Sequence, residues 1–186
     1  MLVLAATFVV QAAEPAPIVT PYDVNGFRTR IEVMIDAPRG EVFDAATGDV
    51  SPWWDHTFWP ETPAELVIEP IFGGVFYERF EAGEDDGVIH AEITAVMAPE
   101  MLRMDGPLGL AGRGYQLVTT WRLSEADDGA ATRFAVELSM IGEVEAELAA
   151  LVRSVWVHFI EGRLRPYVEA GCHLEPEAAC AAFAED

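Results

Sequence analysis

The hydrophobic period of the sequence changes once, near Glu143, and this change limits the possible folds more than any other feature. Before it, apolar and polar residues alternate in runs bounded by Gly, Pro and Asp, the pattern of half-buried β-strands. From Glu143 to Ala170, apolar residues recur at steps of three and four, and Gly171 follows. This pattern predicts one amphipathic helix of about seven turns, loosened near its end by Pro166.

The strand-like runs define an α+β fold with a curved antiparallel sheet of about seven strands wrapped around the C-terminal helix. Two short helices are expected after the first strand, one in APRGEVFDAATG (37–48) and one at the start of DVSPWWDHTFWP, which we name the aromatic segment (49–60). The seven runs are GFRTRIEVMID (26–36), LVIEP (66–70), GGVFYERFE (73–81), GVIHAEITAVM (87–97), MLRMDG (101–106), YQLVTTWRLSE (115–125) and ATRFAVELSMIG (131–142).

The two ends of the chain lie outside this pattern. Residues 1–13 form an apolar run that ends in small residues, which predicts a signal peptide; no basic region precedes it, so the peptide would be truncated. Residues 14–25 form a Pro-rich tether, 26–171 the domain, and 172–186 a tail with two cysteines. Secretion or periplasmic export is favoured, with a buried first strand of a cytoplasmic protein as the alternative. A Cys172–Cys180 disulfide and two unpaired thiols both remain open.

Charge excludes several classes of partner. The sequence has 32 acidic and 11 basic residues, a net charge of −21, so nucleic acid and anionic lipid surfaces are poor partners. All the basic residues are arginine, which excludes lysine Schiff bases and phosphate-loop lysines. No run after the leader is long enough for stable membrane insertion. No cofactor is expected, and the oligomeric state is left open.

Several phrases of the chain resemble a known superfamily. They are APRGEVFDAATGDVSPWW, IEPIFGGVFYERF, AEITAVMAPEMLRM, TTWRLSEADDGAATRF and GRLRPYVEAG. Together with the order of elements, they resemble the helix-grip, START-like or SRPBCC superfamily, and within it the bacterial branch similar to the activator of the heat-shock ATPase. The resemblance covers about residues 26–171. It implies a cavity between the sheet and the C-terminal helix, whereas an activity does not follow from a fold.

Strand parity indicates which side chains would line that cavity. By resemblance to the superfamily, Phe76, Glu78 and Phe80 after the double glycine point inward. An acid on an apolar wall must be paired, hydrogen-bonded or shifted in pKa, so Glu78 is the best candidate for a ligand anchor or a general acid/base. A structural ion pair with an arginine on a neighbouring strand is the alternative.

The aromatic segment is expected at the cavity rim. Trp54 and Phe58 would line the mouth and Trp53 would seal against the long helix, although a packing role is open for each. His56 is a candidate proton carrier opposite Glu78. Two further tryptophans complete the predicted ligand-binding set, Trp121 and Trp156.

Other kinds of site have little support in the sequence. His90 and Glu92 would share a strand face near His158, but no metal-binding spacing accompanies them, and we expect no metal site. No GxSxG motif is present. The Gly-rich stretch 107–116 joins two strands, and so predicts a plain connection or a loop that gates the cavity.

Three functions are compatible with these features. The first is binding of a small hydrophobic or amphipathic ligand in the cavity, which we favour because it requires only shape and one or two polar anchors. The second is a polyketide cyclase or dehydratase-like enzyme that uses Glu78 and His56 for acid/base chemistry. The third is a protein-interaction role like that of the chaperone-ATPase activators, against which export argues.

Overall fold

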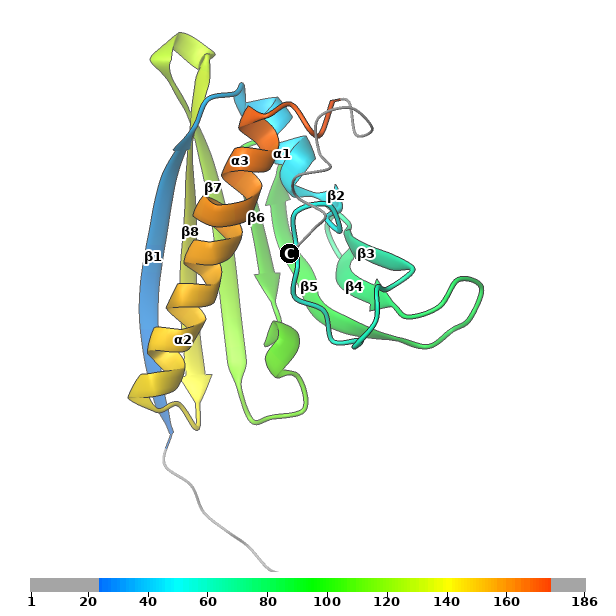
Figure 1. Ribbon diagram of the computed structural model, residues 1–186. Helices are drawn as coiled ribbons and strands as arrows, with labels where there is room; N and C mark the ends of the chain where they lie inside the picture. The colour runs from blue at the N-terminus through cyan, green and yellow to red at the C-terminus, as the bar shows by residue number, and fades with distance from the viewer. Residues whose placement is uncertain (1–23, 175–186) are drawn as a thin grey trace, which may run out of the picture.

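The computed structural model describes residues 24–174, and in that range one antiparallel sheet curves around a C-terminal helix (Figure 1). The predicted leader and nearly all of the tether lie outside the described residues, as does Cys180. The strands are β1 (Asn25–Ile35), β2 (Gly48–Asp49), β3 (Glu65–Ile68), β4 (Val75–Arg79), β5 (Gly87–Met97), β6 (Met101–Asp105), β7 (Gln116–Ala126) and β8 (Ala131–Gly142).

The strand order is β1-β8-β7-β6-β5-β4-β3-β2, so every neighbouring pair except β1 and β8 is consecutive in the chain. β1 pairs with β8 along its whole length, from Asn25 opposite Gly142 to Ile35 opposite Thr132. The inward side of β8 follows from the alternation in its sequence, because every second residue from Thr132 to Met140 is buried. The other face carries charged side chains such as Arg30 and Glu137, which form an exposed ion pair.

The described sheet has eight strands, not the seven predicted. The additional strand is β2, whose two residues pair with Val67 and Ile68 of β3. A strand of two residues is too short to produce a visible alternation. Gly48 follows the C-cap of the first short helix with a positive φ of 73°, as predicted for a helix stop, and it also begins this strand.

The prediction of two short helices after the first strand is half correct. Helix α1 (Arg39–Ala46) forms, but the start of the aromatic segment is a single turn in which the amides of Trp53 and Trp54 bond to the carbonyl of Val50. Beyond this turn, the amides of Phe58 and Trp59 donate to a side chain of β4 and not to the preceding turn. A helix cannot propagate without those bonds.

The C-terminal helix covers the concave face of the sheet in three continuous parts: α2 (Ala146–Val157), a π-helical segment η3 (His158–Leu164) and α3 (Arg165–Glu169). The loosening expected near Pro166 takes the form of η3, which ends two residues before this proline; proline has no N–H to donate. Two short 3₁₀ segments, η1 (Leu108–Leu110) and η2 (Asp127–Gly129), occupy the β6–β7 and β7–β8 connections.

The hydrophobic core fills most of the space between the sheet and the C-terminal helix. Trp121 and Phe134 pack together on neighbouring strands, with ring centroids 5.6 Å apart, and Ile160 and Leu164 of η3 are buried. Cys172 also lies in this core. No helix within residues 24–174 is long and apolar enough to cross a membrane.

Candidate functional site

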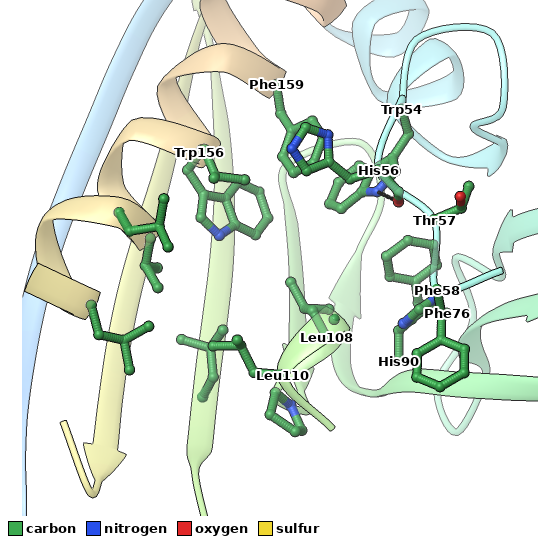
Figure 2. A pocket seen from close by; sticks show the side chains of 17 residues that line it. Trp54, His56, Thr57, Phe58, Phe76, His90, Leu108, Leu110, Trp156 and Phe159 are labelled. Atoms are coloured by element: carbon green, nitrogen blue, oxygen red, sulfur yellow. Dashed lines mark hydrogen bonds between the residues drawn. The ribbon is translucent and has the colours of Figure 1, made fainter. Parts of the chain in front are cut away.

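One end of the space between sheet and helix stays open as a pocket of about 300 Å³, which we name the helix–sheet pocket. In Figure 2, Trp156 and Phe159 approach it from the helix, Leu108 and Leu110 from η1, and Phe76 and His90 from the sheet. Its lining comprises Trp54, His56, Thr57, Phe58, Phe76, His90, Pro107, Leu108, Gly109, Leu110, Leu117, Leu148, Leu151, Val152, Val155, Trp156 and Phe159. All these side chains are apolar except His56, Thr57 and His90.

Of the nine residues predicted to bind a ligand, the structure places five on the wall of the pocket. They are Trp54, His56, Phe58, Phe76 and Trp156. The other four, Trp53, Glu78, Phe80 and Trp121, do not line it. Whether the lining residues bind a ligand stays a prediction.

Trp54 organises the mouth of the pocket. Its ring stacks on Phe159 of the C-terminal helix with centroids 3.9 Å apart, and meets Phe76 of β4 edge-on at 5.1 Å. Its indole N–H donates to the carbonyl of His56, 2.9 Å away. Trp54 therefore contacts the helix, the loop and the sheet. Its ring both packs against the core and lines the pocket, so the two roles expected for it are compatible.

The predicted residues outside the pocket are core or support residues. Trp53 is 1% exposed and donates its indole N–H to the carbonyl of Ala45, so it is fixed against α1. Trp121 is fully buried beneath the helix. Phe80 stacks on Trp59 at 4.6 Å and supports the aromatic segment from below. Strand parity cannot separate these residues from pocket residues, because both groups point inward.

Glu78 points inward, as predicted, but it anchors a loop and does not face the pocket directly. Its side chain is fully buried, and its two carboxyl oxygens accept hydrogen bonds from the amides of Phe58 at 2.8 Å and Trp59 at 2.7 Å. A third donor is Nε2 of His90, at 3.1 Å. Glu78 therefore pairs with a histidine and two backbone amides, and not with the arginine that was considered as an alternative.

His90 is the polar residue of the sheet wall that the sequence did not reveal. Regular alternation would put His90 and Glu92 on one face, but the β4–β5 register shifts between Phe76 and Tyr77, so His90 and Ala91 are both buried and Glu92 is exposed. Such a β-bulge re-aims side chains. The predicted face shared by His90 and Glu92 is therefore wrong.

The imidazole of His90 is held in a defined orientation. Two backbone N–H groups already donate to the Glu78 carboxylate, and a carboxylate only accepts hydrogen bonds, so Nε2 of His90 is assigned as a donor. Nδ1 is buried and makes no hydrogen bond of normal geometry, although the backbone of Leu108 is close enough to raise the pKa of the ring. Burial lowers the pKa of His90, and Glu78 and the Leu108 carbonyl oppose this shift only in part. The pocket wall therefore contains an imidazole that is neutral at neutral pH.

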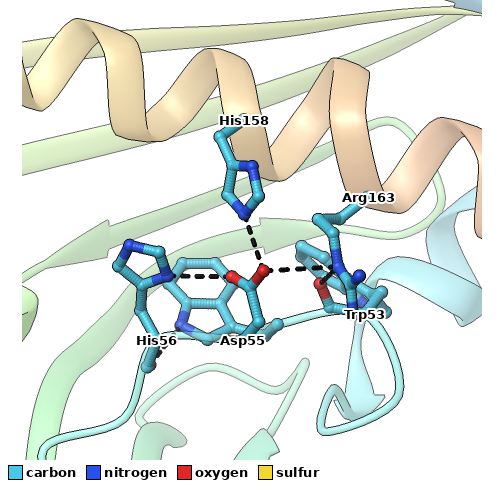
Figure 3. A network of polar contacts seen from close by, with 6 residues as sticks. Trp53, Asp55, His56, His158 and Arg163 are labelled. Atoms are coloured by element: carbon cyan, nitrogen blue, oxygen red, sulfur yellow. Dashed lines mark hydrogen bonds and ion pairs between the residues drawn. The ribbon is translucent and has the colours of Figure 1, made fainter. Parts of the chain in front are cut away.

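The side chain of His56 lies against Asp55 and His158, and its hydrogen bond is to Asp55 and not to Glu78. Its Nδ1 lies 2.8 Å from the carboxylate of Asp55, and His158 of η3 contacts the other oxygen of the same carboxylate through Nε2 at 2.7 Å (Figure 3). Burial raises the pKa of Asp55, but the hydrogen bonds with His158 and His56 outweigh it, and the net pKa is lowered. Asp55 is thus the centre of a polar cluster at the pocket rim.

The apolar part of the lining on η1 and on the helix did not follow from the sequence pattern either. The stretch 107–116, interpreted as a connection or a gate, forms the pocket floor through Pro107, Leu108 and Leu110. Leu108 has a positive φ of 53°, which no residue pattern predicts. The helical residues Leu148, Val152 and Val155 belonged to the predicted apolar stripe, but a stripe does not show where its packing partners end.

Comparisons with known proteins support the fold. No protein-family model and no curated protein matches the sequence. DynU16, encoded in the dynemicin biosynthetic locus, matches with a TM-score of 0.54 and 27% identity over 77% of this chain and 48% of that one. The present chain thus spans about half the length of DynU16.

Two matches that extend over nearly whole proteins agree. SA2116 from Staphylococcus aureus, a protein of unknown function, has a TM-score of 0.57 at 14% identity over 82% of this chain and 99% of its own. A protein from Rhizobium leguminosarum has a TM-score of 0.55 at 18% identity over 81% and 99%. At such identities these matches show the fold alone. The chain therefore has a helix-grip fold, with a pocket at one end of the space between the sheet and the C-terminal helix.

Proposed function

We propose that this protein binds a small hydrophobic or amphipathic molecule in the helix–sheet pocket. The supporting observation is the composition of the wall, which is apolar on the helix, η1 and most of the sheet side. A volume of about 300 Å³ is at the small end of ligand sites, so we expect a compact ligand. Its polar group would lie at His90, whose Nδ1 is the buried polar atom on the wall without a partner.

A pair of variants tests the location of the ligand. Val155 lines the pocket and is half-buried, so Val155→Trp would fill part of the space, whereas Arg153→Trp adds the same ring on an exposed neighbouring position. Native mass spectrometry and organic extraction of purified protein identify any co-purifying molecule. Binding of the neutral probe N-phenyl-1-naphthylamine, followed by its fluorescence, gives an affinity.

We expect Val155→Trp to weaken probe binding at least about tenfold, which corresponds to about 1.4 kcal/mol, and to remove any co-purifying ligand. Arg153→Trp should leave both unchanged. A wild-type protein that carries no ligand and binds no probe would refute the proposal, as would equal effects of the two variants.

A second candidate is acid/base catalysis of the cyclase or dehydratase kind, and the Glu78–His90 pair favours it. A buried carboxylate that orients a neutral histidine leaves the other ring nitrogen able to remove a proton from a bound carbonyl compound. The match to DynU16, from a biosynthetic locus, is in keeping with this idea. The residue that would act differs from the predicted His56: it is His90.

A substitution of His90 distinguishes the two candidate functions. Under the binding function, His90→Gln changes affinity modestly; under the enzymatic function, it abolishes turnover while probe binding persists. The chaperone-activator role and export both stay predictions. Sequencing the N-terminus of the mature form tests export, since a chain that still begins at Met1 contradicts it.

A further inference from the structure

Three polar side chains converge at the rim of the helix–sheet pocket, and ligand binding in the pocket does not use their polar ends. Asp55 and His56 are consecutive in the aromatic segment, whereas His158 comes from η3, about a hundred residues later. Figure 3 shows His158 descending from the helix toward Asp55, with His56 on the other side of the carboxylate. Two of the four histidines in the sequence therefore meet at a single acid.

We propose that Asp55, His56 and His158 form a binding site for a divalent transition-metal ion of the Zn²⁺ class. One possible ligand atom from each residue lies within 4.8 Å of the other two. The nitrogens that contact the Asp55 carboxylate are Nδ1 of His56 and Nε2 of His158. Two imidazoles and one carboxylate are a common ligand set for Zn²⁺ and related ions with an open coordination position.

The geometry requires only small movements. Atoms bound to one zinc ion at about 2.1 Å lie roughly 3–4 Å apart, close to the spacing present. The side chains of His56, His158 and Asp55 are 55%, 42% and 32% exposed, so rotation of the rings meets little resistance. The ion would replace the two hydrogen bonds that now link the histidines to Asp55.

Arg163 is the feature that opposes metal binding. Its Nε lies 3.5 Å from the Asp55 carboxylate and 3.4 Å from the carbonyl of Trp53. This cation repels a metal ion, although it also holds the carboxylate in place. The protein as a whole has a net charge of −21, which raises the local concentration of divalent cations. The balance predicts a site of moderate affinity.

The site has a consequence for the pocket. His56 belongs both to the cluster and to the pocket lining. Three protein ligands leave a position for water or for an oxygen atom of a bound molecule. That position would lie at the mouth of the pocket, between the aromatic segment and η3.

Metal titration of the full, untagged chain after treatment with EDTA tests the proposal. Calorimetry with ZnCl₂ should give one ion per chain, and CoCl₂ should produce the visible absorption bands of coordinated Co²⁺. His158→Ala and Asp55→Asn should each weaken Zn²⁺ binding by roughly a hundredfold, because loss of even an outer partner costs 10–100-fold. His173→Gln is the matched control, since His173 pairs with Glu41 instead, and should bind as the wild type does.

Removal of the opposing cation gives a second test. Arg163→Gln should tighten Zn²⁺ binding, and Zn²⁺ should raise the Tm of the wild type but not that of His158→Ala. Absence of saturable binding, or equal affinities in the wild type and His158→Ala, would overturn the proposal. The side chain of His158 is exposed, whereas that of Arg163 is largely buried, so circular dichroism checks the fold of both variants. His158 does not line the pocket, so a failed metal site leaves binding of N-phenyl-1-naphthylamine intact.

Discussion

Replacement of Glu78 by glutamine tests the anchor of the aromatic segment. The carboxylate accepts three N–H donors in a fully buried position, from Phe58, Trp59 and His90. A glutamine has one accepting oxygen, and its NH₂ group would face at least one of these donors. Loss of one charge-assisted hydrogen bond, with a buried donor left unsatisfied, should cost about 2–4 kcal/mol of the free energy of unfolding. That is a large part of the total of about 5–15 kcal/mol.

Urea unfolding at neutral pH, followed by tryptophan fluorescence and circular dichroism, measures this loss. Glu81→Gln on the exposed turn after β4 is the matched control and should change stability by less than about 0.5 kcal/mol. Hydrogen exchange adds a local measurement: the amides of Phe58 and Trp59 should lose protection, whereas the Trp54 amide, bonded to Val50, should keep it. A Glu78→Gln protein as stable as the control, with both amides protected, would refute the anchoring role.

Three other perturbations follow from the structure. Burial lowers the pKa of His90 below its usual 6.5, so on acidification the unfolded chain takes up a proton before the folded protein does. The free energy of unfolding should therefore fall as the pH drops from 6.5 toward the lower pKa of the folded state. NMR titration of the ring, and unfolding of His90→Gln over the same pH range, check this. Gly106→Ala would push a Cβ against the carbonyl oxygen of His90 and should cost about 1–3 kcal/mol of the free energy of unfolding. Gly109→Ala is the control, because its Cβ would meet nothing within 4 Å; equal unfolding midpoints of the two variants would contradict the packing at the bulge. Trp53→Phe breaks a hydrogen bond to Ala45, but the Trp121 indole nitrogen has no partner, so Trp53→Phe should destabilise by about 1 kcal/mol more than Trp121→Phe in thermal unfolding.

The regular part of the fold could be predicted because buried and exposed residues recur there with the fixed period of a strand or a helix. The inward residues of β8, the long strands and the extent of the C-terminal helix all follow from periodicity. The eighth strand was missed because two residues contain no period. The second short helix was predicted wrongly because the capture of the Phe58 and Trp59 amides by Glu78 is a contact between residues about twenty positions apart. Local sequence does not contain that information.

The candidate site was harder to predict for a related reason: its polar groups lie where regular structure is interrupted. His90 faces the pocket because β5 contains a bulge, and His158 stands at the start of the π-helical segment η3. An interruption shifts the face of every following residue, so a period taken across it assigns the wrong side. Both interruptions cost hydrogen bonds or strain that regular elements avoid, and both adjoin the pocket or its rim. A sheet and a helix that are interrupted next to the pocket could hold His90 and the Asp55 cluster in fixed positions around a bound molecule.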